Sequence, residues 1–163
     1  MKLARKRVAV ATVGFAVCGA VAAAALASPP SGFAPTNLVA EAERPAPIDV
    51  DSDGVKLQTT DPVDVRVQLA KFGPGGRSGW HHHPGIVIVA IKTGTLTVLD
   101  ENCNATTYGK GSPNGSVFIE AGDAPGEVRN NTGKPARAYA TFIAPDADPG
   151  VFRIEDTPPD CAA

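Results

Sequence analysis

All three histidines of this chain are consecutive: His81, His82 and His83. In an extended strand, side chains alternate between the two faces, so His81 and His83 share one face and His82 points to the other. Two imidazoles on one face, one residue apart, can reach a single metal ion. Because no histidine lies elsewhere in the sequence, a Ser–His–Asp or Cys–His catalytic set has no support. The sequence therefore points to metal chemistry, or to incidental metal capture by the run itself.

The segments around the histidines favour short strands. A turn at 74–76 precedes them, and an apolar run at 86–91 follows and is bounded by Gly94. Polar and apolar residues alternate in 64–72, with Val65, Val67 and Leu69 on one face. Further candidate strands are 55–59, 95–99, 106–108, 116–119, 127–130 and 136–144. About eight short strands with no long helix predict an all-β fold, a closed barrel or jelly roll, because closure removes exposed sheet edges.

The N-terminus is typical of a secretory signal peptide. A basic start at 2–7 precedes an apolar run at 8–27, which ends in the small-x-small sequence Ala25-Leu26-Ala27. An uncleaved anchor is the alternative, because the run is just long enough to span a membrane. We expect cleavage, a secreted or extracytoplasmic location, and no stable membrane insertion afterwards.

The 163-residue length allows one domain. We expect a signal peptide at 1–27, a Pro/Ala-rich arm or linker at 28–47, a barrel at 48–145 and a tail at 146–163. The net charge is −2, and there is no basic block beyond the N-terminus. Nothing therefore suggests a nucleic-acid partner.

Cysteine usage supports export. Cys18 is lost with the signal peptide, which leaves Cys103 and Cys161. An even number of cysteines in an oxidising compartment predicts a disulfide between a mid-domain loop and the tail. Closing a loop of this length stabilises a fold by about 4 kcal/mol in the chain-entropy model. Two unpaired thiols are the alternative.

The histidine strand resembles the first sequence motif of the cupin superfamily. That motif is a glycine, five residues, His-x-His, a glutamate and a closing glycine. Gly75, His81, His83 and Gly94 match it, whereas Val87 occupies the glutamate position. The match implies a cupin-type barrel over roughly 55–145, and the Trp-His-x-His-Pro-Gly string resembles a group of small exported bacterial cupins.

The second cupin motif is recognisable only at its ends. Glu120-Ala121-Gly122 and Arg129-Asn130 resemble its beginning and its end, but the position of its histidine falls on Pro125 or Gly126. Cupins that carry out chemistry commonly hold Fe, Mn, Ni, Cu or Zn with three histidines and one glutamate. The resemblance therefore implies a metal site in which half of the ligands are missing.

The nearest oxygen donor to the missing histidine is Glu127. An irregular turn before it could direct it inward, so that His81, His83 and Glu127 would bind the metal. Glu120 and Asp123 are further candidates. Two histidines and one carboxylate suit non-haem Fe(II) or a hydrolytic Zn²⁺.

Two classes of function follow. The first is an exported cupin-like protein with a degenerate metal site, which binds a small molecule or a metal in the barrel mouth. The pocket would be lined by the histidines with Val87, Ile91, Phe118 and Phe142. The alternative is a metal-dependent enzyme of the oxygenase or isomerase type. A homodimer formed through the Pro-rich arm and an exposed sheet edge is also expected from the resemblance.

Overall fold

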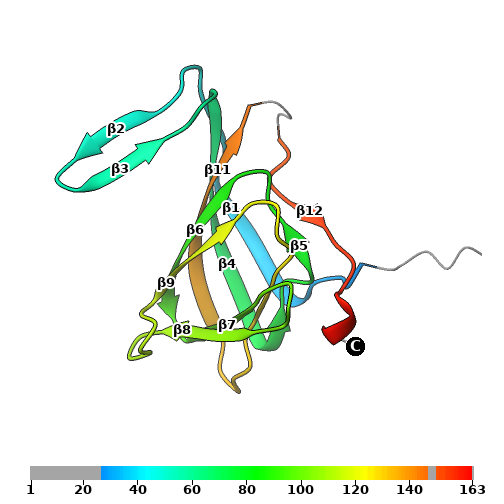
Figure 1. The fold of residues 1–163 in the computed structure, drawn as a ribbon. Helices are drawn as coiled ribbons and strands as arrows, with labels where there is room; N and C mark the ends of the chain where they lie inside the picture. Colours follow the sequence, from blue (N-terminus) through cyan, green and yellow to red (C-terminus); the bar gives the residue numbers. More distant parts are fainter. Residues whose placement is uncertain (1–26, 147–149, 163) are drawn as a thin grey trace, which may run out of the picture.

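The computed structural model describes residues 27–146 and 150–162 (Figure 1). Residues 1–26 of the expected signal peptide lie outside the described residues. The described chain is built of strands, and none of its helices is long and apolar enough to cross a membrane. The elements are β1 (Ser31–Arg44), β2 (Asp49–Ser52), β3 (Val55–Gln58), β4 (Val63–Arg77), β5 (His81–His82), β6 (Ile86–Thr93), β7 (Thr95–Leu99), β8 (Ala105–Gly109), β9 (Val117–Ala121), β10 (Glu127–Arg129), β11 (Ala136–Pro145), β12 (Ile154–Glu155) and the 3₁₀ turn η1 (Asp160–Ala162).

A single antiparallel sheet rolls into the barrel. Its strand order is β8-β7-β10-β4-β11-β6-β9, and β1 pairs with β4. At the seam, the rings of Tyr108 in β8 and Phe118 in β9 lie 5.1 Å apart, so the sheet nearly closes on itself. The predicted all-β barrel class is confirmed. Closure leaves few unpaired backbone groups at the sheet edges.

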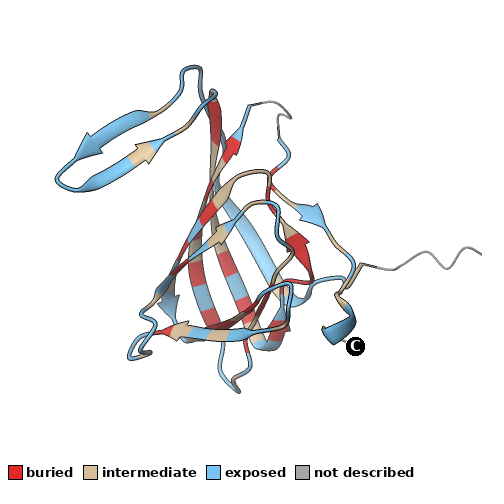
Figure 2. Ribbon diagram, viewed as in Figure 1, coloured by how far each residue is buried: buried red, intermediate tan, exposed pale blue. Residues whose placement is uncertain are grey.

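Along the barrel strands, buried residues alternate with intermediate or exposed ones, as the colours of Figure 2 show. On β4 the interior side chains are Arg66, Gln68, Ala70 and Phe72, which line a central cavity. The alternation predicted for 64–72 is therefore present. However, the apolar side chains of Val65, Val67 and Leu69 face outward, because the polar ones face the cavity.

Two parts of the chain lie outside this sheet. The β2–β3 hairpin projects from one end of the barrel (Figure 1). Asp53 and Gly54 at its tip both have positive φ, 50° and 83°, as a tight two-residue hairpin turn requires. The second part, the C-terminal strap (150–162), crosses the barrel mouth, where β12 pairs with β5.

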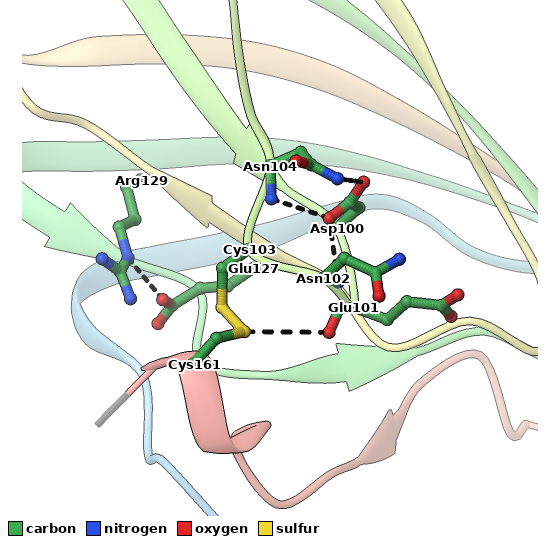
Figure 3. The surroundings of a disulfide bond; sticks show 8 residues. All are labelled: Asp100, Glu101, Asn102, Cys103, Asn104, Glu127, Arg129 and Cys161. Carbon is green, nitrogen blue, oxygen red and sulfur yellow. Dashed lines mark hydrogen bonds and ion pairs between the residues drawn. A yellow bond between two sulfur atoms is a disulfide. The ribbon is translucent and has the colours of Figure 1, made fainter.

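The Cys103–Cys161 disulfide fastens the C-terminal strap to the β7–β8 loop (Figure 3). The side chain of Asp100 organises that loop, because it accepts hydrogen bonds from the backbone of Asn102 and from the backbone and side chain of Asn104. These bonds lower the pKa of Asp100 below its usual value. The predicted disulfide is confirmed.

Candidate functional site

The histidine run places two imidazoles inside the barrel, as alternation predicts. His81 and His83 are each only 5% exposed, and their ring centroids lie 4.8 Å apart in an edge-on arrangement. His82 points away from them, and its Nδ1 lies 2.8 Å from the carboxylate of Asp156 in the C-terminal strap. The short strand β5 thus divides its histidines between the cavity and the strap.

Backbone carbonyls fix the tautomer of both interior histidines. Nδ1 of His81 lies 2.8 Å from the carbonyl oxygen of Gly79, and Nδ1 of His83 lies 2.6 Å from that of Phe152. Because a carbonyl oxygen only accepts hydrogen bonds, each Nδ1 must carry the proton. In the neutral rings, Nε2 then presents a free lone pair to the cavity, which is the form that binds metals. Nε2 of His83 is buried and makes no hydrogen bond within the described residues.

Glu120 in β9 completes the group. The ligand atoms of His81, His83 and Glu120 all lie within 4.8 Å of one another. We call these three residues the His–His–Glu cluster. Two metal–ligand bonds of about 2.1 Å each span about 4.2 Å, so the cluster is close to the size that one ion requires. Oε2 of Glu120 lies 3.4 Å from Nε2 of His83.

Burial sets the charge state of the cluster. Desolvation lowers the pKa of His81 to about 4, and the attraction of Glu120 only partly opposes this shift. Desolvation acts to raise the pKa of Glu120, but the neighbouring His83 ring and the positive charges nearby outweigh it, so this pKa lies below its usual value. At neutral pH, His81 is therefore uncharged and Glu120 is a carboxylate.

The cluster opens onto a cavity of about 140 Å³ inside the barrel. Most of its wall is apolar, and the polar groups besides the cluster are Arg66, Gln68, Ser78 and Arg153. The guanidinium of Arg66 stacks 3.9 Å from the ring centroid of Phe152, and Arg153 pairs with Glu155. Of the lining expected from the sequence, the histidines, Phe118 and Phe142 are present, whereas Val87 and Ile91 do not line this cavity.

No protein-family model matches the sequence, and no curated protein matches it by sequence. Solved structures are similar to it in fold. A cupin-2 domain from Rhodospirillum rubrum aligns with a TM-score of 0.51 at 13% identity, over 83% of this chain and 75% of that chain. The chain has a cupin fold. The DMSP lyase DddQ from Ruegeria pomeroyi aligns with a TM-score of 0.51 at 17% identity, over 77% of this chain and 52% of that chain.

A protein with a double-stranded β-helix domain from Klebsiella pneumoniae aligns with a TM-score of 0.47 at 18% identity, over 69% of this chain and 80% of that chain. The two alignments with a TM-score of 0.51 establish the cupin fold alone, because their sequence identities are low. The chemistry of this cupin barrel must therefore be argued from its own side chains.

Glu127 lies away from the histidines of the cupin barrel. Its side chain is 1% exposed and forms an ion pair with Arg129, and Figure 3 shows both residues in the surroundings of the disulfide. The preceding residue, Gly126, does face the site, because it exchanges backbone hydrogen bonds with His81. Alternation then turns Glu127 to the opposite face. Asp123 lies in an exposed turn with a φ of 75° and is not part of the cluster.

The first cupin motif places its glutamate on the strand that is β6 here, whereas the carboxylate of the cluster comes from the neighbouring strand, β9. Val87 in β6 holds the motif's glutamate position, and its Cα pairs directly with that of Glu120 in β9. Directly paired residues of an antiparallel ladder point to the same face, with their Cβ atoms about 5 Å apart. Glu120 therefore delivers a carboxylate to the region that a glutamate at position 87 would reach.

Proposed function

We propose that this protein is a metal-dependent enzyme of the cupin fold. In this proposal the His–His–Glu cluster binds one divalent transition-metal ion, and a small organic molecule occupies the adjoining cavity. Three protein ligands are the number found in catalytic sites, because they leave coordination positions free for substrate or water. Two histidines and a carboxylate are the donor set of non-haem iron(II) sites and of several hydrolytic zinc sites.

One observation carries the proposal. Nε2 of His83 is 3.4 Å from a carboxylate oxygen of Glu120, and this nitrogen is buried without a hydrogen-bond partner in the described chain. When the His83 ring is neutral, its proton is on Nδ1, so an Nε2 lone pair faces a carboxylate lone pair and the two repel each other. A cation between the two atoms converts this repulsion into two favourable bonds.

The residues around the cluster suit a catalytic role. The carbonyl oxygens of Gly79 and Phe152 hold both imidazoles in the ligating tautomer, as hydrogen-bond partners behind metal ligands do in general. The aromatic walls contributed by Phe118, Phe142 and Phe152 exclude water and accommodate an apolar body. A bound ion of this class supplies a Lewis acid or, for iron, a redox centre.

We also propose that the protein acts outside the cytoplasm. The disulfide supports this location, because structural disulfides persist in oxidising compartments. The basic and apolar N-terminal residues support it as well, since their pattern is that of a secretory signal.

Metal analysis of the purified mature protein tests the proposal. Protein supplied separately with Fe²⁺, Mn²⁺, Ni²⁺, Cu²⁺ and Zn²⁺, then dialysed, should retain about one ion per chain for at least one metal. His83→Asn and Glu120→Gln should lose that ion. Asp123→Asn is the matched control, because Asp123 lies in an exposed turn outside the cluster and should not affect binding. A wild-type protein that retains no stoichiometric metal, or a Glu120→Gln variant that binds as tightly as the wild type, would refute the proposal.

A further inference from the structure

The cavity wall contains an arginine whose charge is not neutralised by a carboxylate. Arg66 and Arg153 both line the cavity. Arg153 forms an ion pair with Glu155 and also donates a hydrogen bond to the carbonyl oxygen of Ser78. Arg66 forms no ion pair within residues 27–146 and 150–162. Of these two cations, Arg66 is therefore the one whose charge remains available to a ligand.

Neighbouring groups hold the guanidinium of Arg66 in place. Its Nε donates to the carbonyl oxygen of Ala40, 2.7 Å away, and one Nη donates to that of Gly150 at 3.5 Å. Its plane also lies 3.9 Å from the ring centroid of Phe152. A guanidinium has five N–H groups, so three of those of Arg66 make no hydrogen bond to the described residues. Two such groups are enough to bind both oxygens of a carboxylate.

Arg66 and the metal cluster lie at the two ends of one interior row of side chains. Arg66 in β4 pairs with Phe142 in β11, Phe142 pairs with Val87 in β6, and Val87 pairs with Glu120 in β9. Directly paired residues of an antiparallel ladder point to the same face. Three strand spacings separate the backbones of Arg66 and Glu120 by about 14 Å along the sheet. Because both side chains extend inward from a curved sheet, a molecule only a few atoms long can contact both.

Aromatic rings cover the distance between the two ends of the row. The ring centroid of Phe142 lies 5.3 Å from that of His83 and 6.1 Å from that of Phe152, over which Arg66 stacks. The cavity has a volume of about 140 Å³. A dry protein cavity of about 150 Å³ accommodates benzene. The apolar part of a ligand is therefore at most about as large as one aromatic ring.

We infer that the substrate is a small organic monocarboxylate, whose carboxylate pairs with Arg66 while its other end reaches the His–His–Glu cluster. With a divalent ion in the cluster, the positive charges of the ion and of Arg66 exceed the negative charge of Glu120, so the cavity attracts an anion. A single guanidinium balances one negative charge, and the mostly apolar wall disfavours a second. The role as substrate rests on the proposed function, but the pairing with Arg66 does not require the ion.

Binding of matched acids and amides to metal-free protein tests this inference. In isothermal titration calorimetry, butyrate and benzoate should bind at least about tenfold more tightly than butyramide and benzamide, because the uncharged amides lose the charge-assisted hydrogen bonds. Arg66→Met should abolish this preference, and Arg66→Lys should reduce it, because lysine keeps the charge but not the paired donors. Arg137→Met is the matched control, because Arg137 is exposed on β11 and does not line the cavity.

The metal content of the same variants separates this inference from the proposed function. Arg66→Met should retain the ion that the wild type retains, because Arg66 is not part of the cluster. If Arg66→Met does not fold, as judged by circular dichroism, the reduced preference of Arg66→Lys decides the question. Acids that do not bind at about 10 mM, a preference that survives in the Arg66 variants, or a preference that appears only in metal-loaded protein would overturn the inference. A wild type without stoichiometric metal would refute the proposed function alone.

Discussion

Replacing Cys161 by serine should destabilise the fold by an amount that follows from the position of the disulfide. Cys103 and Cys161 are separated by 58 positions in the sequence. In the chain-entropy model, opening a loop of this length increases the entropy of the unfolded chain by about 14 cal/mol/K, which corresponds to about 4 kcal/mol at room temperature. That loss is a large fraction of the stability of a typical domain.

Urea denaturation of metal-free protein, followed by circular dichroism, measures this loss. Cys103→Ser, Cys161→Ser and the double variant should lose the same free energy of unfolding, because each opens the same loop. Wild-type protein in a reducing agent should behave as they do. A loss below about 1 kcal/mol, or single variants that differ from the double by more than about 0.5 kcal/mol, would refute the loop-closure argument.

The same variants should also weaken metal binding. The C-terminal strap supplies the carbonyl oxygen of Phe152 that holds His83 in its ligating tautomer. Releasing the end of the strap loosens this contact, and losing such a partner typically costs tenfold to a hundredfold in metal affinity. Titration of Zn²⁺ or Fe²⁺ into reduced and oxidised protein measures the difference. Equal affinities would show that the strap holds its place without the disulfide.

Three further predictions concern buried groups. Exchanging Val87 and Glu120 in one double variant should restore much of the metal binding that Glu120→Val abolishes, as measured by metal content, because the two positions are paired. The free energy of unfolding of the metal-free protein should fall by about 3 kcal/mol as the pH decreases from about 6.5 to about 4. The pKa of His81 is near 6.5 in the unfolded chain and about 4 in the folded protein, so protonation in this pH range favours the unfolded chain. Thermal melts measure the change, and His81→Gln should show a smaller one. Arg129→Leu should cost about 3 kcal/mol in urea denaturation, because it leaves the buried carboxylate of Glu127 unpaired, and adding Glu127→Gln should recover part of the loss.

The sequence was sufficient for the class of fold and for the orientation of the histidines. Both follow from local alternation, which the strands preserve. It was not sufficient to decide which face of β4 is interior, because a barrel with a polar site reverses the usual pattern. Arg66 and Gln68 face the cavity, and the apolar residues that alternate with them point outward from the barrel. The sequence also does not distinguish the projecting β2–β3 hairpin from the barrel strands, because polar and apolar residues alternate in both.

Glu120 was among the candidate ligands, but its priority over Glu127 could not be read from the sequence. The choice depends on the register between β6 and β9 and on which face of β10 turns inward, and neither is a local property. One signal was available. Glu120 and Phe118 are two residues apart on one strand, so their side chains lie on the same face. Because the sequence places Phe118 in the pocket, it also places Glu120 there.

The direct pairing of Val87 with Glu120 bears on how such a barrel can change during evolution. In the metal site proposed above, a chain with carboxylates at both positions would keep its oxygen donor, so the donor can move from one strand to its neighbour in two substitutions without loss of the site. Two related chains could then share such a site while differing in the residue that a sequence motif requires. In antiparallel barrels, the cross-strand neighbour of a missing ligand is the first position to inspect before a centre is judged to have been lost.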